Sequence, residues 1–411
     1  MAGDTLELTP AEMVHGGQTL ARQGKRVIFT PYTIPGERFL AQLTDDRGRY
    51  AFAENLRVLA PSAQRVTPRC PHFGPGQCGG CHFQHIDYAA QPGYKRDVVI
   101  DQLRRIGGFS DPPVRPTIAS PDAWAYRYHA TFQVDEAGNL CFVGTDNTTL
   151  IPIDECHILR PELRDLLAEL NFEDVQGLTR VRVQVGSAGD LMLVLSTADD
   201  EAPELEVTMP VSVNLLLSDN EPVNLIGAST VSYTAHGRSF RVTAGGFFQV
   251  NLPQAEALVD LVLEALDLRG EETVLDLYAG VGLFTAFLAE RAALVTSVES
   301  YPPAVTDADV NLADLDNVDL IEGSVEDVLP ELEGPYDAAV LDPPRAGMDG
   351  VALDALVALG PRALVYVSCE PSTLARDAKR LAAHGYRLLA VTPVDMFPQT
   401  YHIECVAHFA R

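Results

Sequence analysis

Cys369 lies at the carboxyl end of a short apolar run, in the stretch Val365-Tyr-Val-Ser-Cys-Glu-Pro371. Asp342 ends the preceding apolar run, in Asp342-Pro-Pro-Arg345, and Glu404 lies downstream of both. Ligands of open α/β sheets bind at the carboxyl ends of the strands, so we expect this thiol to do chemistry. A thiolate can add to an electron-poor carbon, and a carboxylate can accept a proton. The three residues therefore predict a covalent mechanism with a cysteine nucleophile and a carboxylate base.

A second group of residues is typical of a cofactor pocket. Residues 273–284 read Thr-Val-Leu-Asp-Leu-Tyr-Ala-Gly-Val-Gly-Leu-Phe, which predicts a strand, a Gly-rich turn and a helix start. Such a turn lets the backbone approach a ligand, although a plain tight turn has the same pattern. Glu299 ends the next apolar run, where an acidic side chain can accept both hydroxyls of a ribose. Because nothing in this turn suits a pyrophosphate, we expect an adenosyl ligand without phosphates and not NAD.

Hydrophobic patterning predicts the strands and helices that carry these residues. From Pro253 onward, helical segments alternate with short buried strands, which predicts a doubly wound, Rossmann-like α/β sheet. The first sixty residues alternate short β-like runs with Gly and Pro turns, which is typical of a five-stranded OB-like barrel. We expect three domains: the barrel over 1–62, a mostly β central domain with a cysteine-rich loop over 63–245, and the α/β domain over 246–411.

Composition limits the possible partners. The 411 residues are 46% hydrophobic and contain no apolar run of membrane-spanning length, so we expect a cytoplasmic protein without a membrane partner. The net charge of −27 is unfavourable for binding nucleic acid. The charge is uneven, however, because residues 1–130 hold 15 Lys and Arg against 12 Asp and Glu, and the remainder holds 15 against 45. The front of the chain can therefore face a polyanion.

The seven cysteines are an odd number in a chain without an export signal, which favours metal and catalytic roles over disulfides. Cys70, Cys78 and Cys81 lie on one Gly-rich loop, and Cys156 supplies a fourth possible ligand. Spacing alone leaves structural zinc and an iron–sulfur cluster equally open, since both accept four thiolates.

Several motifs together resemble the RNA uracil-C5 methyltransferases. They occur in this order: Gly246-Phe-Phe-Gln-Val-Asn251, Asp276-Leu-Tyr-Ala-Gly-Val-Gly282, Asp342-Pro-Pro-Arg-Ala-Gly347, Val367-Ser-Cys-Glu-Pro371 and Phe397-Pro-Gln-Thr-Tyr-His-Ile-Glu404. The front of the chain adds a barrel similar to the TRAM domain and the sequence Cys78-Gly-Gly-Cys-His-Phe-Gln-His85. These two parts resemble the branch that acts on large-subunit ribosomal RNA, because the transfer-RNA branch is expected to lack both.

The resemblance implies a role for each candidate residue. Cys369 would be the nucleophile and Glu404 the base. The four cysteines would hold a 4Fe–4S cluster that joins the barrel to the central, RNA-binding domain. The partner would be 23S ribosomal RNA, the product 5-methyluridine, and the protein a monomer. The contacts to S-adenosylmethionine would come from Gln249, Tyr278, Gly280, Glu299 and Asp342.

The chemistry explains why these residue types are needed. Uracil C5 is a poor nucleophile, and addition of the Cys369 thiolate at C6 converts the ring into an enolate that can react at C5. The C5 proton must then leave, and Glu404 can accept it. A base in structured RNA must first leave its stack, at a cost of roughly a few kcal/mol.

The RNA-binding surface is less well defined by the sequence. The stretch 141–150, where relatives often carry basic residues, contains no Lys or Arg. Contact with RNA would then depend on basic residues of the front of the chain and of a helix predicted over about 88–107. These residues are Arg22, Lys25, Arg26, Arg47, Arg49, Lys95, Arg96, Arg104 and Arg105.

Other functions compete with this one. A lone cysteine is usually a small buried apolar residue, and a lone glutamate near a C-terminus is usually solvated. The chain could methylate transfer RNA or another base such as adenine N6, although Arg345 stands where that chemistry has an aromatic residue. It could also be a non-catalytic RNA-binding or RNA-folding factor. The presence of both Cys369 and Glu404 argues against lost catalysis.

Overall fold

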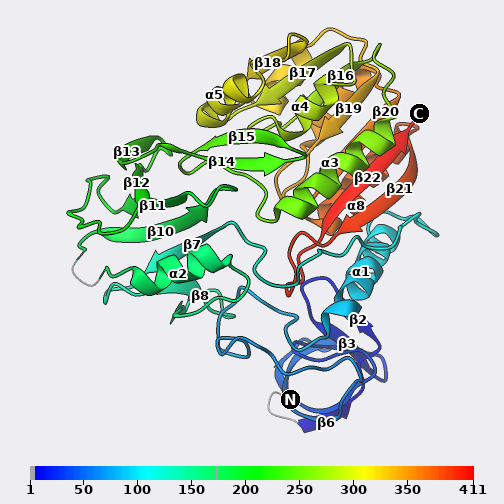
Figure 1. Cartoon of the computed structure of the whole chain (residues 1–411). Helices are drawn as coiled ribbons and strands as arrows, with labels where there is room; N and C mark the ends of the chain where they lie inside the picture. The colour runs from blue at the N-terminus through cyan, green and yellow to red at the C-terminus, as the bar shows by residue number, and fades with distance from the viewer. Residues whose placement is uncertain (1–4, 173–174) are drawn as a thin grey trace.

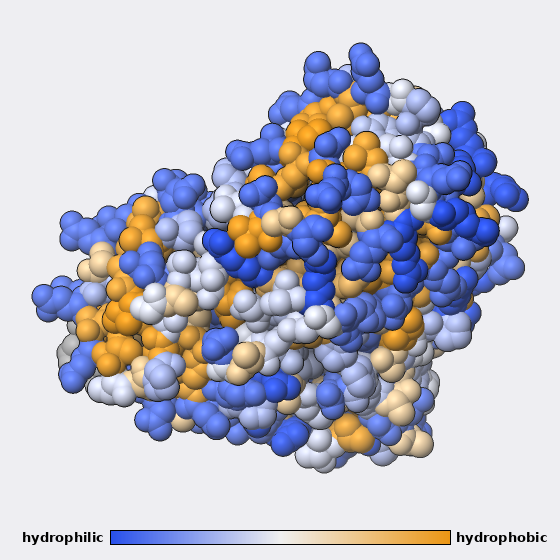
Figure 2. Space-filling model, turned by 45° about the horizontal axis from the view of Figure 1, so that its top comes forward, coloured by the Kyte–Doolittle hydropathy of each residue, from blue (hydrophilic) through white to orange (hydrophobic). Residues whose placement is uncertain are grey.

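The computed structural model describes residues 5–172 and 175–411. Figure 1 shows an N-terminal β-structure, a central β-sheet and a C-terminal sheet flanked by helices. The face in Figure 2 is largely hydrophilic, with apolar patches over the central sheet at the left and over the C-terminal domain at the top. Within the described ranges, no helix is long and apolar enough to cross a membrane.

The N-terminal sheet has six strands in the described residues, one more than the sequence predicts. The additional strand, β2, has only two residues. The sheet order is β1-β5-β6-β4-β3-β2, and Figure 1 shows it curving round on itself about a small core that includes Ile28, Phe39 and Ala51. The strands are β1 (Thr5–Leu8), β2 (Glu12–Met13), β3 (Thr19–Gln23), β4 (Arg26–Thr30), β5 (Arg38–Asp46) and β6 (Tyr50–Ala60).

The central sheet has the order β13-β12-β11-β10-β7-β8-β9, and a separate hairpin, β14–β15, leads from it to the C-terminal domain. Helix α2 (Pro161–Glu169) packs against β10. The strands are β7 (His129–Val134), β8 (Leu140–Val143), β9 (Leu150–Pro152), β10 (Leu178–Val185), β11 (Leu191–Thr197), β12 (Val211–Leu216), β13 (Pro222–Ile226), β14 (Thr230–Ala235) and β15 (Arg238–Thr243).

The C-terminal sheet confirms the predicted α/β fold class. Its order is β18-β17-β16-β19-β20-β22-β21, with five parallel strands and an antiparallel pair, β22 and β21, at one edge. The strands are β16 (Thr273–Leu277), β17 (Leu294–Glu299), β18 (Val318–Glu322), β19 (Ala338–Leu341), β20 (Ala363–Ser368), β21 (Arg387–Val394) and β22 (Glu404–Ala410). The helical segments are α3 (Leu252–Leu266), α4 (Leu283–Ala289), α5 (Pro302–Asn311), α6 (Val325–Val328), η2 (Leu329–Glu331), α7 (Gly350–Ala358) and α8 (Pro371–Ala383).

Two cores form on opposite faces of this sheet because successive side chains of a strand point to opposite sides. Val274 and Val340 belong to a core that continues into the central domain, whereas their neighbours Leu275 and Leu341 belong to the other. The second core includes Val98, Val99 and Leu103 of α1 (Gln91–Arg105), which follows the short helix η1 (Tyr88–Ala90). Helix α1 therefore packs on the C-terminal sheet, against α8 and β21.

Candidate active site

The thiol of Cys369 and the carboxyl groups of Asp342 and Glu404 lie near one another at the carboxyl ends of the parallel strands of the C-terminal sheet. Cys369 directly follows β20, and Glu404 is the first residue of β22. The ladder between these strands pairs Ser368 with Cys405, so Cys369 and Glu404 lie opposite each other just beyond that pair. Asp342 directly follows β19, the parallel neighbour of β20. The hydrophobic patterning therefore placed the ends of β19 and β20 correctly.

Each of the three groups binds its proton more tightly than usual. Glu404 is only 3% exposed, and burial, together with the charge of Asp342, raises its pKa well above the ordinary value. Burial raises the pKa of Asp342 to about 7. The Cys369 thiol is half-buried, and burial followed by the charges of Glu404 and Asp342 raises its pKa to about 12. The site therefore disfavours several negative charges at once.

Arg345 is the cation that opposes this effect. Its positive charge lowers the pKa of both Cys369 and Glu404, although burial outweighs it in each case. Arg345 itself is exposed, three residues beyond Asp342 and directly after two prolines whose fixed φ stiffens the turn. The sequence analysis assigned this arginine no catalytic role. Its proximity to Cys369 and Glu404 depends on how separate strands pair, which the sequence pattern does not show.

The turn after β16 has the geometry expected of a ligand-binding loop. Tyr278, Gly280 and Gly282 all have positive φ, at 63°, 57° and 88°. A Cβ added to Gly282 would lie 3.0 Å from a Leu312 methyl carbon, so packing helps to explain that glycine. Nothing lies within 4 Å of a Cβ added to Gly280, so the backbone there faces open space. A ligand can approach the main chain at Gly280.

Glu299 is held against this turn by backbone donors. Its Oε2 accepts a hydrogen bond from the Gly280 N–H at 2.8 Å, and its Oε1 accepts from the N–H groups of Ser300 and Tyr301, each at 2.8 Å. The structure thus brings two of the predicted cofactor residues together. The carboxylate is fixed in position and keeps free lone pairs, as an acceptor for ligand hydroxyls should.

Asp276 is a residue to which the sequence assigned no role, although it begins one of the quoted motifs. It is fully buried, and burial raises its pKa to about 7. Its Oδ2 accepts a hydrogen bond from the Thr285 hydroxyl at 2.5 Å, and its Oδ1 is buried without a partner among the described residues. Together with Gly280 and Glu299, this acceptor fits a ligand that brings its own donors.

Gln249 reaches the domain from a different segment, between β15 and α3. It is buried, at 7% exposure, while the neighbouring Phe247 is 62% exposed. Arg182 of β10 donates to the carbonyls of Gly245 and Gly246 at 3.3 and 2.9 Å. The central domain therefore holds the start of the Gly246–Asn251 motif in place.

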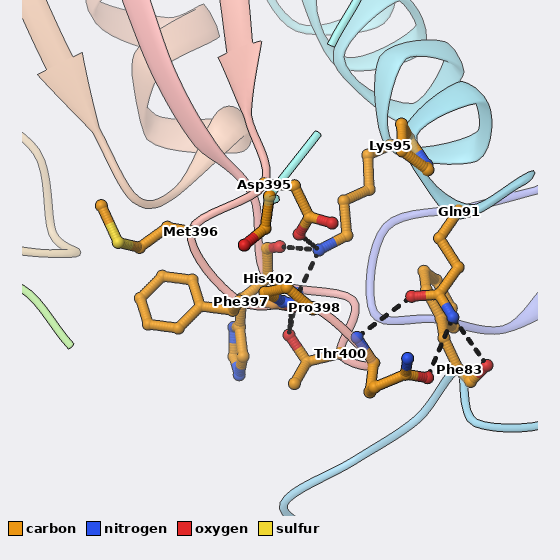
Figure 3. Close-up of polar contacts among 12 residues, drawn as sticks. Phe83, Gln91, Lys95, Asp395, Met396, Phe397, Pro398, Thr400 and His402 are labelled. Atoms are coloured by element: carbon orange, nitrogen blue, oxygen red, sulfur yellow. Dashed lines mark hydrogen bonds and ion pairs between the residues drawn. The ribbon is translucent and has the colours of Figure 1, made fainter. Parts of the chain in front are cut away.

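The loop that leads to Glu404 is held by α1, as Figure 3 shows. The Lys95 ammonium donates to Asp395 Oδ1 at 2.6 Å and to the carbonyls of Phe397 and His402 at 3.0 and 2.8 Å. Lys95 and Asp395 are both buried, and burial lowers the pKa of Lys95 against the opposing effect of Asp395. The prediction that Lys95 faces RNA is wrong. Lys95 lies on the face of α1 that packs on the C-terminal sheet, and its charge is paired there with Asp395.

A second residue of α1 fixes the same loop. Gln91 donates to Gln399 Oε1 at 3.0 Å and accepts from the Gln399 N–H at 3.0 Å. The N-terminal domain contacts the other side of the site, since His15, between β2 and β3, has its Nε2 3.1 Å from Oε1 of Glu370, the residue after Cys369. These contacts join residues about 300 or more positions apart in the sequence, so no local pattern could have predicted them.

The four candidate metal ligands line one cavity of about 390 Å³, with Cys81 and Cys156 buried and Cys70 and Cys78 half-buried. All four are free thiols. Burial raises the pKa of each, that of Cys156 to about 11. In the described part of the chain, no three His, Cys, Asp or Glu side chains are arranged to hold a single metal ion. The four cysteines thus line one cavity, while their role as ligands and the group that they bind stay predictions.

Comparisons with known proteins match this chain to RNA methyltransferases. A family model described as tRNA (Uracil-5-)-methyltransferase matches residues 229–411. A relative from Streptomyces avermitilis, named an uncharacterized RNA methyltransferase, is 34% identical, with 98% of each chain covered. A relative of the same description from Halalkalibacterium halodurans is 36% identical, with 98% of this chain and 96% of the relative covered.

One solved structure shares the fold over nearly the whole length. It is a tRNA (uracil-54, C5)-methyltransferase from Pyrococcus abyssi in complex with S-adenosyl-L-homocysteine, with a TM-score of 0.74 and 23% identity over 98% of this chain and 99% of that one. At this identity the likeness shows the fold alone. The full-length relatives and the family model, taken with the strand-end cysteine and carboxylates, show that the chain belongs to the RNA uracil-5 methyltransferase family.

Proposed function

We propose that the chain methylates uridine at C5 in RNA through a covalent bond between Cys369 and C6. The observation that carries this proposal is the β20–β22 ladder, which sets a half-buried thiol opposite a buried carboxylate at the ligand-binding edge of the sheet. S-adenosylmethionine would supply the methyl group as an electron-poor sulfonium. Its contacts would come from Gln249, Tyr278, Gly280, Glu299 and Asp342, with Asp276 added by the structure.

Two protein groups, Cys369 and Glu404, take part in the bond changes at the uracil ring. The Cys369 thiolate forms a bond to C6, and the electron pair of the C5=C6 bond moves toward O4. That pair returns to C5 as C5 bonds to the methyl carbon, whose bond to the cofactor sulfur would break and leave S-adenosylhomocysteine. C5 then carries the methyl group and its original hydrogen, and Glu404 accepts that hydrogen as a proton. The C–H electron pair restores the C5=C6 bond, the C6–S bond breaks, and the thiolate is regenerated. One proton remains on Glu404 and is released to solvent.

The shifted pKa values suit this order of events. A carboxylate whose pKa is raised is a stronger base than an ordinary one, so Glu404 is well matched to a carbon acid. Glu404 must be ionised when it acts, and the positive charge of Arg345 favours the ionised form. The thiolate also benefits from Arg345, while the charges of Glu404 and Asp342 oppose it. Addition of the thiolate to C6 moves its negative charge onto the uracil ring. This step should therefore come before Glu404, in its ionised form, accepts the C5 proton.

The proposed substrate is 23S ribosomal RNA. The N-terminal barrel does not separate this chain from transfer-RNA enzymes, because the tRNA enzyme from Pyrococcus abyssi shares the fold over 98% of this chain. Transfer RNA is therefore the second candidate, favoured by that shared fold. Mapping 5-methyluridine in ribosomal and transfer RNA, with and without the gene, decides between them. Loss of a site from 23S RNA alone supports the first, and loss from transfer RNA alone overturns it.

We also propose that Cys70, Cys78, Cys81 and Cys156 hold a 4Fe–4S cluster. All four thiols line one cavity of about 390 Å³, so they converge on a single space. Four cysteine thiolates can hold a 4Fe–4S cluster or a structural zinc ion. The resemblance to the iron–sulfur branch of the family favours the cluster. Bound, the group would tie the cysteine-rich loop to the central domain.

The cluster proposal has a direct measurement. Protein purified without oxygen should be brown and contain about four irons per chain. Stoichiometric zinc without iron would overturn it. A Cys141→Ala variant is the matched control, since Cys141 lines the same cavity but lies outside the proposed ligand set.

A further inference from the structure

A second cavity lies where the N-terminal sheet, the cysteine-rich loop, the central domain and the loop before Glu404 meet. Its volume is about 410 Å³, which is within the range of small-ligand sites. Gly16 and Gly17 approach from the N-terminal sheet, His82 from the cysteine-rich loop, Asn147 from the central domain and Tyr401 from the loop before Glu404. Four segments far apart in sequence therefore build one polar pocket.

A row of partly exposed aromatic rings leads from this cavity toward the reaction site. The ring centroids of His82 and Tyr401 are 4.3 Å apart, those of Tyr401 and His402 4.4 Å, and those of His402 and Phe397 5.8 Å. All four side chains keep partial exposure to solvent. Because these rings are not sealed in a core, a planar group can approach and pack against them.

The turn at Gly17 is shaped around the Tyr401 ring. Gly17 has a φ of 77°, which favours glycine, and an added Cβ would lie 3.0 Å from the Tyr401 Cβ and 3.2 Å from its ring. A larger residue would displace the ring. The loop that carries Tyr401 is itself fixed by Lys95 and Gln91 (Figure 3). Tyr401 is therefore held in place and need not be ordered when a ligand arrives.

A chain of contacts connects the cavity to the residue that follows the thiol. Tyr401 is three residues before Glu404, and the ring of His15, which adjoins Gly16, is 6.2 Å from that of Tyr401. His15 Nε2 in turn lies 3.1 Å from Glu370, the residue after Cys369. A base in the cavity could therefore belong to a nucleotide near the uridine that binds at Cys369 on the same RNA strand.

The lining favours a neutral base over a phosphate. No Lys or Arg is among the residues that line the cavity in the described part of the chain, and Glu54 is its single formal charge. Gln18, Asn55 and Asn147 offer amide donors and acceptors. The Oδ1 of Asn55 is buried without a hydrogen-bond partner among residues 5–172 and 175–411. Amides of this kind recognise base edges, while backbone phosphates need cations.

We propose that this cavity binds an unstacked RNA base close to the target uridine, with Tyr401 and His82 as its stacking surface. The inference rests on the proposed function. It means that the enzyme binds a second nucleotide of the RNA in addition to the target uridine. Binding a neighbour outside the stack would hold the RNA open around the target base, whose removal from the stack is otherwise unfavourable.

The test compares Tyr401→Ala with Tyr401→Phe. The Ala variant should weaken binding of a fluorescein-labelled RNA that carries the mapped uridine by about 5- to 150-fold, the range of lost base–aromatic stacking. The Phe variant keeps the ring and should stay within a few-fold of the unsubstituted protein. Affinity for S-adenosylmethionine should change little in either, because the cavity lining contains none of the proposed cofactor contacts.

Replacing RNA bases gives the second measurement, and it does not depend on the variant's stability. Nucleotides flanking the uridine are made abasic one at a time. One abasic position should weaken RNA binding by the unsubstituted protein as much as Tyr401→Ala does. The same abasic RNA should bind Tyr401→Ala no more weakly than intact RNA does, because the missing base and the Tyr401 ring form a coupled pair. Additive losses at every position, or an Ala variant that binds RNA normally, would overturn the inference. Absence of any methylation by the unsubstituted protein would instead overturn the proposed function.

Discussion

Replacing Glu404 by glutamine should stop the reaction after the covalent bond has formed. Glutamine keeps the size of the side chain and its place at the start of β22, but it cannot accept the C5 proton. A positioned general base contributes roughly 10²- to 10⁴-fold to a rate. Because Glu404 is only 3% exposed, water or buffer should replace it poorly, so we expect a loss toward the upper end of that range.

The assay is a single-turnover reaction with labelled RNA, resolved on a denaturing gel. Glu404→Gln should form a protein–RNA complex that survives denaturation and decays slowly, while the unsubstituted protein forms it only transiently. The double variant Cys369→Ala, Glu404→Gln should form none. Normal turnover by Glu404→Gln, without accumulated complex, would refute the role of Glu404 as the base.

Three further changes have definite expected outcomes. Arg345→Gln removes the charge that lowers the pKa of Cys369, so the pKa should rise and alkylation of the thiol by iodoacetamide at a fixed pH should slow. Lys95→Met leaves Asp395 buried without its cation, which should lower the free energy of unfolding by about 3–5 kcal/mol, measured by denaturant titration. Cys70→Ala should lose most of the iron of anaerobically purified protein, measured by metal analysis, if the cavity holds the proposed cluster.

Each of these has a contradicting result. Faster alkylation in Arg345→Gln would mean that the arginine does not favour the thiolate. Unchanged stability in Lys95→Met would mean that the buried pair does not hold the loop before Glu404. Full iron content in Cys70→Ala would remove that residue from the ligand set.

The sequence predicted the strand-end residues well because they obey a local rule. A buried strand of a parallel sheet is a short apolar run, and the residue after it must lie at the ligand-binding edge. Asp342, Cys369 and Glu299 could therefore be placed from patterning alone. Glu404 was placed by its motif, and its position opposite Cys369 depends on the antiparallel pairing of β22, which the sequence did not show.

The contacts that the sequence missed are all long-range. Lys95 recurs with other basic residues along a predicted helix, which favoured a solvated face, yet its partner Asp395 is 300 residues away. The contact of His15 with Glu370 has the same origin. Burial of a charge depends on which element packs over it, and that information is spread over the whole chain.

The covalent bond at Cys369 is best tested by locating it. RNA that contains 5-fluorouridine should trap the enzyme in the presence of S-adenosylmethionine, because fluorine at C5 cannot leave as a proton. After digestion with protease and nuclease, mass spectrometry should find a methylated fluorouridine nucleotide on the peptide that contains Cys369 and on no other. Methylation of ordinary RNA with no trapped peptide, or with the nucleotide on a different residue, would contradict the mechanism.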